Sequence, residues 1–496
     1  MTFVITQSCC NDAHCVSVCP VNCIHPTPDE PDFATTEQLY VDPRSCIDCG
    51  ACASACPVDA IFPAESLSAP LAGHAERNEA YFDGLPVQPE WAATRWPRTL
   101  PSGTGLRVAV IGTGPAACYT AQTLLRTTDA RVTIIEREDL PGGLVRYGVA
   151  PDHPTTKRVS GSFAWIFGHE RVTMRLRTEV GRDVSLDDLR ATHHAVVAAV
   201  GAVEDRRLDI PGEQLPGVIA GGDFARWVNG HPAAPPPDLT SSRAVVIGNG
   251  NVALDVARLL AADPDSLPPD LAPHVKAALR RSRVREVVVL GRRGPEHAAY
   301  TGSELTALRY LPGVSTVVDD TPGVAGTIEG AGAVGSAAAV RSTGAKAALL
   351  QGIERVAVDW SQEPTGRRIV LRFGSAPLEV RGVGRATGVA LDAFTIDAGL
   401  VVTSIGRRGR ALAGLPFDES QGTVPHSGGR VVDPTTGQVQ PGLYVAGWIK
   451  RGSTGGIGAN RFDAEETVGA LVEDGASGRL PQPTDAPRWR RLLRLG

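Results

Sequence analysis

The sequence predicts an α/β protein in which two units with parallel sheets follow a small, cysteine-rich α+β domain. Apolar runs typical of strands alternate with helical runs from Leu106 onward, which is the pattern of a parallel α/β fold. An apolar run, a glycine-rich turn and a helical run follow one another twice, starting at Arg107 and at Arg243. Nine of the ten cysteines lie between Cys9 and Cys56, so sulfur chemistry belongs to the first domain.

The length and composition are those of a globular protein of about three domains. The chain has 496 residues, more than one hydrophobic core usually holds. Of these residues 42% are hydrophobic and 21% are charged, as in globular proteins. A net charge of -5 with dispersed Lys and Arg gives no argument for binding nucleic acid or a membrane. No apolar run reaches the length of a membrane span, and the first residues, MTFVITQSCC, show no secretory pattern. We therefore expect a soluble, cytoplasmic protein.

The first domain carries a strong iron-sulfur motif. The run CIDCGACASACP, residues 46–57, has the spacing C-x2-C-x2-C-x3-C-P, which aims three thiolates at one iron-sulfur cube. The run CCNDAHCVSVCP, residues 9–20, repeats this spacing with Asp12 at the place of the second cysteine. Because the fourth cysteine of such a run usually binds the other cluster, the sequence predicts two clusters.

The crossing pattern divides seven cysteines between these clusters. The expected ligands are Cys46, Cys49, Cys52 and Cys19 for a [4Fe-4S] cluster, and Cys9, Cys15 and Cys56 for the second one. A carboxylate is a harder and weaker iron ligand than a thiolate, so we expect [3Fe-4S] there, with an Asp12-ligated [4Fe-4S] cluster as the alternative. Residues 2–62 resemble seven-iron bacterial ferredoxins. Structural zinc and disulfides suit this spacing and this chain less well, and Cys10 and Cys23 stay unassigned.

A proline-rich segment follows the first domain. Residues 66–104 contain five prolines, which disfavour helix interiors and central strands, so this segment is expected to be a linker. It also contains Tyr81, Phe82, Trp91 and Trp96. Because a solvated tether seldom has so many aromatic residues, we expect a strap along the surface of the next domain.

The first glycine-rich turn predicts a dinucleotide site of the Rossmann type. In RVAVIGTGPAACYTAQTLL a strand runs into Gly112-x-Gly114-x-x-Ala117 and a helix, so backbone N–H groups can face a pyrophosphate. Glu136 ends the following strand, RVTIIE, 22 residues after Gly114. At that place a carboxylate can accept hydrogen bonds from a ribose, so the two features together predict an adenosine site.

The segment LPGGLVRYGVAPDHP, residues 140–154, resembles the adrenodoxin-reductase-like ferredoxin-NADP reductases. In that family the loop runs along a flavin. The resemblance implies that FAD is contacted by Ala116, Glu136, Leu144 and Val180, the last within the matching EVGRDV. It also implies that His153 lies near the redox centre and assists proton movement; a histidine that only satisfies its own loop is the equally weighted alternative.

The second glycine-rich turn predicts a second nucleotide and its type. SRAVVIGNGNVALDVARLLA places Gly248-x-Gly250-x-x-Ala253 between a strand and a helix. After the next strand, REVVVLG, stand Arg292 and Arg293, where a site for NAD would present Asp or Glu. A guanidinium can pair with a 2'-phosphate, so NADP is expected over NAD, whereas an isolated arginine pair would more often be a solvated strand end. The family resemblance implies NADP contacts by Asn249, Gly250, Asn251, Val252, Arg292, Arg293 and Glu304.

The closing segment GLYVAGWIKRGSTGGIGANRFDAEETV resembles the end of the flavin domain in the same family, GWVKRGPTGVI. By this match the residues that contact FAD are Trp448, Gly455, Gly456 and Ile457, and Gly455 also approaches the nicotinamide. Ser453 and Gly456 depart from the family's Pro and Val. A tryptophan that only fills the core is the alternative for Trp448.

These features divide the chain and predict its activity. We expect a ferredoxin domain over 1–65, a linker over 66–104, an FAD domain over 105–204 and 397–496, and an NADP domain over 205–396. The resemblance implies a ferredoxin-NADP+ reductase in which NADPH reduces FAD and electrons pass to the fused iron-sulfur domain. A further ferredoxin or a haem monooxygenase is the expected partner.

The sequence fits three other functions less well. An electron-entry subunit like the small subunit of glutamate synthase also combines iron-sulfur ligands with two nucleotide sites, but its cysteines have a different spacing. A non-catalytic iron-sulfur scaffold would not need two intact glycine turns, Glu136 and the arginine pair. Disulfide reduction needs a cysteine pair beside the flavin, and only Cys118 follows Cys56.

Overall fold

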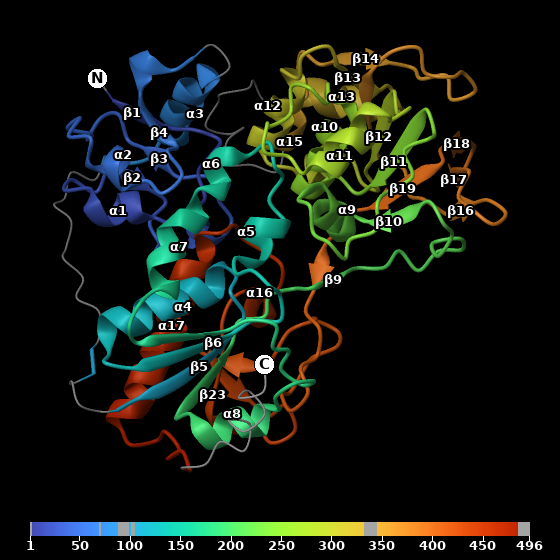
Figure 1. The fold of residues 1–496 in the computed structure, drawn as a ribbon. Coiled ribbons are helices and arrows are strands. Elements are labelled where there is room, and N and C mark those ends of the chain that lie inside the picture. The colour runs from blue at the N-terminus through green and yellow to red at the C-terminus, as the bar shows by residue number, and fades with distance from the viewer. Residues whose placement is uncertain (1, 69–70, 88–98, 101–104, 332–344, 485–496) are drawn as a thin grey trace.

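The computed structural model describes residues 2–68, 71–87, 99–100, 105–331 and 345–484. Figure 1 shows three units: a small one near the N-terminus, a lower one that contains both early and late segments of the chain, and a third built from the middle of the chain. Within the described residues, no helix is long and apolar enough to cross a membrane.

The N-terminal unit consists of two halves with the same backbone. Helices α1 (His14–Val18) and α2 (Ala51–Ala55) are related by 37 residues, as are the left-handed pairs Asn11 and Asp48, Ala13 and Gly50, and Asn22 and Asp59. Each half therefore wraps its cysteines with the same turn. Short antiparallel pairs join the halves: β1 (Phe3–Ile5) with β4 (Ile61–Pro63), and β2 (Ile24–His25) with β3 (Tyr40–Val41).

The expected strap is partly a helix that belongs to this N-terminal unit. Helix α3 (Gly73–Tyr81) packs against β1 and β3. The Asn78 side chain accepts from Val41 N at 2.7 Å and donates to Val41 O at 2.6 Å, and Tyr81 stacks on Tyr40 with 4.3 Å between ring centroids. The aromatic residues were thus a signal of packing, but onto the preceding domain. Residues 88–98, with Trp91 and Trp96, lie outside the described residues.

The lower unit is built on a seven-stranded sheet in the order β21-β22-β23-β8-β5-β6-β7. Its five parallel strands are β5 (Arg107–Ile111), β6 (Arg131–Ile135), β7 (Val172–Arg175), β8 (Ala195–Ala198) and β23 (Val439–Val445). The strands β21 (His426–Ser427) and β22 (Arg430–Val432) extend it in antiparallel fashion. β5 and β8 are almost fully buried because helices and loops cover both faces.

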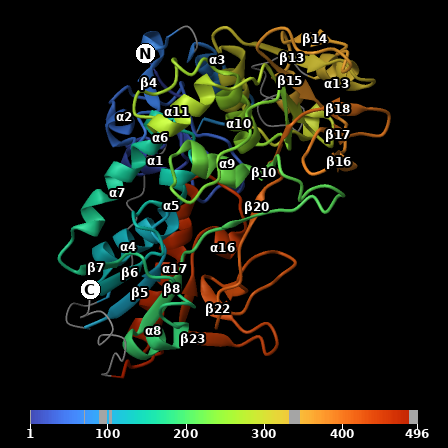
Figure 2. The same ribbon diagram turned by 45° about the vertical axis from the view of Figure 1, so that its right-hand side comes forward.

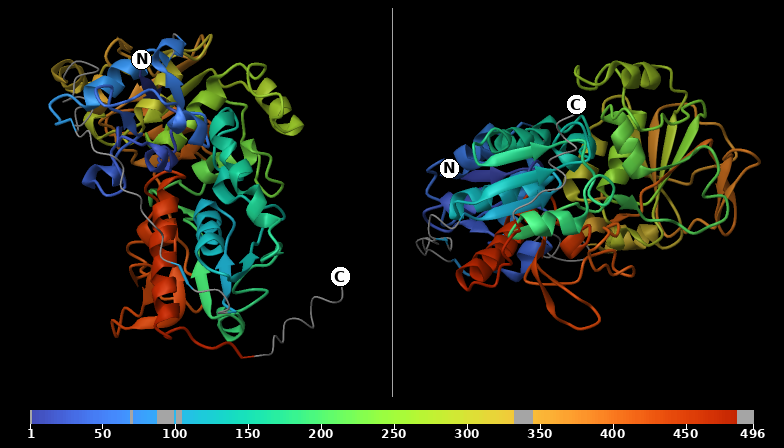
Figure 3. Two further views of the ribbon diagram at one scale, coloured as in Figure 1. Left: turned by 90° about the vertical axis from the view of Figure 1, so that its left-hand side faces the viewer. Right: turned by 60° about the horizontal axis from the view of Figure 1, so that its bottom comes forward.

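Helices from both ends of this unit cover one face of the sheet. Helix α4 (Pro115–Thr127) follows the first glycine turn and packs along α17 (Ala459–Ala476), as the left view of Figure 3 shows. The remaining helices are α5 (Gly143–Tyr147), α6 (Pro154–Lys157), α7 (Val159–Phe167), α8 (Leu186–Thr192) and α16 (Trp448–Arg451). The first glycine turn therefore lies beside the closing segment.

The third unit is a second, all-parallel sheet in the order β10-β19-β11-β12-β15-β13-β14. The strands are β10 (Val218–Ala220), β11 (Arg243–Ile247), β12 (Glu286–Leu290), β13 (Ser315–Asp319), β14 (Glu354–Val356), β15 (Arg368–Arg372) and β19 (Leu400–Thr403). The helices are α9 (Gly221–Val228), α10 (Asn251–Ala261), α11 (Pro273–Arg280), α12 (Gly302–Arg309), α13 (Val324–Gly330) and α15 (Ala345–Ala348). A small antiparallel sheet holds β16 (Glu379–Arg381), β17 (Gly388–Ala390) and β18 (Thr395–Asp397).

The chain crosses between the two larger units along one narrow ribbon. β9 (Glu204–Asp205) leads into the third unit and pairs with β20 (Arg407–Arg408), which leads back, as Figures 1 and 2 show. The expected boundary of the FAD domain at residue 397 falls just before β19 (Leu400–Thr403). β19 is an apolar run that either sheet could accept, and it lies between β10 and β11 of the second sheet.

Candidate cofactor sites

The four cysteines expected to bind the first cluster line one small cavity, together with Phe3, Val21 and Cys23. These are Cys19, Cys46, Cys49 and Cys52. Hydrogen bonding by the Cys23 thiol lowers the pKa of both Cys19 and Cys46 to about 6. A thiolate is the form that binds iron, so this set of donors fits an iron-sulfur cluster. Cys23 is buried, and its sulfur lies 3.3 Å from that of Cys19.

The second set of cysteines surrounds Asp12. Burial raises the pKa of Cys9 to about 12 and that of Cys15 well above its ordinary value, and the charges of Cys56 and Asp12 add to both shifts. The thiols of Cys9, Cys15 and Cys56 and the Asp12 carboxylate therefore lie near one another. The Asp12 carboxylate is 5% exposed and forms an ion pair with the Nδ1 of His14. His14 contacts both oxygens of the Asp12 carboxylate, one through its backbone N–H and the other through its ring Nδ1.

The first glycine turn, the loop after β6 and Glu136 meet at one edge of the first sheet. The Thr113 hydroxyl donates to the Glu136 carboxylate and accepts from Gly142 N at 3.1 Å. A Cβ at Gly112, whose φ is +109°, would lie 2.6 Å from Ala199 O, whereas a Cβ at Gly114 would meet nothing among the described residues within 4 Å. The turn therefore packs closely against the end of the sheet at Gly112, whereas the space in front of helix α4 is open at Gly114. This is the shape that a pyrophosphate needs.

The closing segment completes this edge. A Cβ at Gly447 would lie 2.5 Å from Ala116 Cβ, so the closing segment touches the first turn of α4. The Trp448 indole N–H donates to Gly455 O at 3.2 Å and holds the Gly-rich turn in place. Three predicted FAD contacts, Ala116, Trp448 and Gly455, are therefore neighbours or share a hydrogen bond. Leu144 is half-buried on α5, and Val180 is buried in the core around β5 and β8.

The second glycine turn is built in the same way. Gly248 has a φ of +120°, and a Cβ there would lie 2.1 Å from Ser404 O at the end of β19. Asn249 accepts from Ala299 N at 3.3 Å, and Asn251 accepts from Thr301 N at 2.7 Å. The two asparagines of NGNV thus fix the loop that leads into α12. Gly250 lies between the two asparagines as the N-cap of α10, and Val252 is 39% exposed.

Arg292 and Arg293 follow β12 and are exposed. In the described part of the chain neither guanidinium has a carboxylate partner, although most arginines of this unit do. A free pair of guanidinium groups at the end of the strand next to the glycine turn fits a phosphate ligand.

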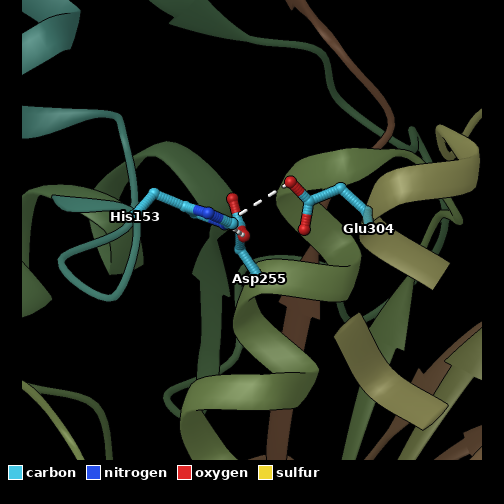
Figure 4. Close-up of side chains that lie close together, drawn as sticks. All are labelled: His153, Asp255 and Glu304. Atoms are coloured by element: carbon cyan, nitrogen blue, oxygen red, sulfur yellow. Dashed lines mark hydrogen bonds and ion pairs between the residues drawn. The ribbon is translucent and has the colours of Figure 1, made fainter. Parts of the chain in front are cut away.

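His153 joins the two larger units through a buried charge cluster. As Figure 4 shows, its ring points from the loop before α6 towards Asp255 on α10 and Glu304 on α12. Its Nε2 lies 3.1 Å from Asp255 and 3.4 Å from Glu304. Arg258 pairs with both of these carboxylates and with Asp152.

Groups of both charge signs contact the His153 imidazole, because Arg258 Nη2 lies 2.6 Å from the same Nε2 that faces the two carboxylates. Burial opposes the charge, but hydrogen bonds to Asp255 and Glu304 outweigh it and raise the pKa of His153 to about 10. Three carboxylates surround one guanidinium and one imidazole, so protonation reduces the net negative charge of the cluster. The same contacts lower the pKa of Glu304. The structure thus brings together the predicted redox histidine and a predicted NADP residue.

Sequence reasoning did not find Asp152, Asp255 and Arg258 as members of this cluster. One signal was present: Asp255 and Arg258 are the only charged residues in the apolar helix NVALDVARLLA. Charges on an otherwise apolar helix next to a glycine turn indicate a buried polar network. Their partners Asp152 and His153 lie more than 100 positions away in the sequence, so no local pattern indicates these contacts.

The closing segment also contacts the cysteine-rich unit. Gly458 N donates to Cys10 O at 2.8 Å, and Arg461 donates to Asp12 O at 3.1 Å. A Cβ at Gly458 would lie 2.0 Å from Asp12 N, so only glycine allows this approach. The loop that carries the predicted FAD contacts Gly455 to Ile457 therefore lies directly against the Asp12 side of the cysteine-rich unit.

Family models match two parts of the chain. The 4Fe-4S binding domain matches residues 39–62, and the pyridine nucleotide-disulphide oxidoreductase domain matches residues 106–289. A "Probable ferredoxin/ferredoxin--NADP reductase" of Mycobacterium leprae is 46% identical over 98% of this chain and 89% of its own length. The chain belongs to the ferredoxin/ferredoxin-NADP reductase family. The relative of the same name in Mycobacterium tuberculosis is 47% identical over 98% of this chain and 86% of its own length.

Solved structures match about three quarters of the chain. FprA from Mycobacterium tuberculosis, in complex with NADPH, has a TM-score of 0.68 and 38% identity, and covers 79% of this chain and 89% of that chain. These matches confirm the predicted α/β fold class and the predicted family. A mitochondrial NADPH:adrenodoxin oxidoreductase of Arabidopsis thaliana is 38% identical over 75% of this chain and 83% of its own length, in agreement with the predicted adrenodoxin-reductase resemblance.

Proposed function

We propose that this chain is a ferredoxin-NADP+ reductase that exchanges electrons between NADPH and its own iron-sulfur domain by way of FAD. A single observation carries the proposal: the glycine-rich loop of the closing segment contacts Cys10 and Asp12 through Gly458 and Arg461. That loop also lies beside the first glycine turn. Nucleotide sites and cysteine sites are thus parts of one continuous structure and not independent modules on a tether.

The residues fit the three kinds of cofactor. The lower unit would hold FAD with its first glycine turn, Glu136 and the closing segment, and the third unit would hold NADP. The N-terminal unit would hold two iron-sulfur clusters. When bound, FAD supplies the exchange between two-electron chemistry with a nicotinamide and one-electron chemistry with clusters. The chain itself would supply phosphate-facing backbone N–H groups and the half-buried Trp448 side chain.

We propose that Asp12 leaves the second cluster in the [3Fe-4S] form. Support comes from the ion pair between Asp12 and His14, which directs the carboxylate towards an imidazole in place of a metal. Three thiols, of Cys9, Cys15 and Cys56, remain as donors. Thiolates are the donors that iron-sulfur clusters prefer, so the corner next to Asp12 is the weakest one.

We further propose that His153 holds a proton between the two nucleotide-binding units and positions Glu304 for the nicotinamide nucleotide.

A cytoplasmic location suits the thiolates, which a reducing compartment preserves. The onward partner would be a ferredoxin or a haem monooxygenase, received at the exposed side of the first cluster, where Cys49 and Ile47 lie at the surface.

The choice of nucleotide gives the test. Replacing both Arg292 and Arg293 by Ala removes the charge partners of a 2'-phosphate, each worth about 1.5–3 kcal/mol when fully engaged. The KM for NADPH should therefore rise by about a hundredfold or more, with little change for NADH. Arg281→Ala, an exposed arginine of the same unit, is the control. Equal effects on both nucleotides would contradict the assignment of these two arginines.

A further inference from the structure

The N-terminal unit contacts the third unit as well as the lower one. Glu37 lies in the loop before β3, and its Oε2 accepts a hydrogen bond from Gly302 N at 2.8 Å. Its other carboxylate oxygen forms an ion pair with Lys346 on α15. Gly302 is the first residue of α12, so a carboxylate from the iron-sulfur unit occupies the N-terminus of a helix in the nucleotide unit. A helix N-terminus favours such a negative charge.

The residues around this contact form one connected structure. Lys346 donates to Tyr300 O at 2.6 Å, and the buried Tyr300 hydroxyl donates to Lys346 O at 3.1 Å. Thr301 N donates to Asn251, and the Thr301 hydroxyl accepts from Glu304 N at 3.4 Å. Residues 300–302 are therefore held between Glu37 with Lys346 on one side and Asn251 on the other.

Glu304 is the link to the rest of the site. It lies two residues after Gly302, in the first turn of α12, and its carboxylate contacts Arg258 at 2.8 Å and His153 at 3.4 Å. Asn251 and Glu304 are both assigned to the NADP site by the proposed function. The start of α12 thus sets the positions of two groups of that site, and Glu37 holds that start from another domain.

We propose that Glu37 is a positioning residue of the NADP site: the iron-sulfur domain supplies the carboxylate that fixes the start of α12 and, through it, Asn251 and Glu304. This inference rests on the proposed function. It also means that the iron-sulfur domain has a second role besides carrying clusters, because it completes the support of the nicotinamide nucleotide site.

Binding of NADP+ to the holoprotein tests this directly. The dissociation constant is measured from the change in flavin absorbance on titration with NADP+, which needs no turnover. Glu37→Ala removes both contacts and should raise the dissociation constant by about tenfold, the effect of losing one charged hydrogen bond of typical strength. Glu37→Gln keeps an acceptor for Gly302 N and loses only the charge, so it should fall between wild type and Glu37→Ala.

The controls separate positioning from general damage. FAD content, iron content and the electron paramagnetic resonance spectrum of the clusters should be unchanged in both variants, and so should the maximal rate of flavin reduction at saturating NADPH. Glu65→Ala, an exposed glutamate of the same domain, should bind NADP+ as wild type does. If a fully loaded Glu37→Ala or Glu37→Gln protein binds NADP+ as tightly as wild type, the inference is wrong. If wild type itself gives no response to NADP+, the proposed function is wrong.

Discussion

At the scale of single residues, the proposed [3Fe-4S] form of the second cluster depends on Asp12. Asp12→Cys supplies a fourth thiolate, so the protein should gain one iron atom per chain. The signal that an oxidised three-iron cluster gives in electron paramagnetic resonance should disappear, because an oxidised [4Fe-4S] cluster is silent. Asp12→Asn, which offers no thiolate, should keep the signal. Wild-type protein with the iron content of Asp12→Cys and no such signal would refute the three-iron assignment.

The charge of His153 should appear in the dependence of stability on pH. Its pKa is raised from 6.5 to about 10 in the folded chain, so below pH 6.5 its contribution to folding is complete. As the pH rises from 6.5 towards 10, His153 loses its proton in the unfolded chain but keeps it in the folded chain, so its contribution to the free energy of unfolding decreases. The advantage of wild type over His153→Gln in the urea midpoint should therefore be largest near pH 6 and shrink above it. A difference that stays constant up to pH 10 would show that the imidazole is neutral.

At the scale of elements, the proposed function assigns the two glycine turns to different nucleotides. Gly248→Ala places a Cβ 2.1 Å from Ser404 O at a φ of +120°, which forces a backbone shift costing about 1–3 kcal/mol. We expect purified protein that keeps its flavin but binds NADP+ about tenfold more weakly or worse. Gly161→Ala, in helix α7 with open space around it, is the matched control and should leave binding intact. Loss of FAD together with NADP+ would contradict separate sites.

The elements also show what a sequence can predict. Both glycine turns, Glu136 and the cysteine runs were predictable because each is a local pattern whose chemistry depends on neighbours along the chain. The helical fold of residues 73–81 was not, because its stability comes from the Asn78 bonds to Val41 and the stacking on Tyr40. The assignment of β19 was not predictable either, since an apolar strand gives no sign of which sheet it joins.

At the scale of the whole molecule, the N-terminal unit touches both larger units. Besides the Gly458 and Glu37 contacts, Arg158 pairs with Asp59 at 2.8 Å, and the Ser8 and Thr155 hydroxyls lie 3.3 Å apart. Contacts of this kind join residues from 99 to 449 positions apart in the chain. The sequence indicated the modules and their cofactors, whereas the way they fit together depends on tertiary contacts without a local signature. The individual site residues and the division into domains stay predictions for experiment.

The central claim is that one chain joins a nicotinamide nucleotide, a flavin and iron-sulfur clusters in a single electron pathway. Anaerobic titration of the purified protein with NADPH, and separately with NADH, tests it when flavin absorbance and the paramagnetic signals of the clusters are followed together. We predict that NADPH bleaches the flavin at concentrations where NADH does little, and that the clusters then become reduced. A flavin that bleaches while the clusters stay oxidised, or one that responds equally to both nucleotides, would contradict the account.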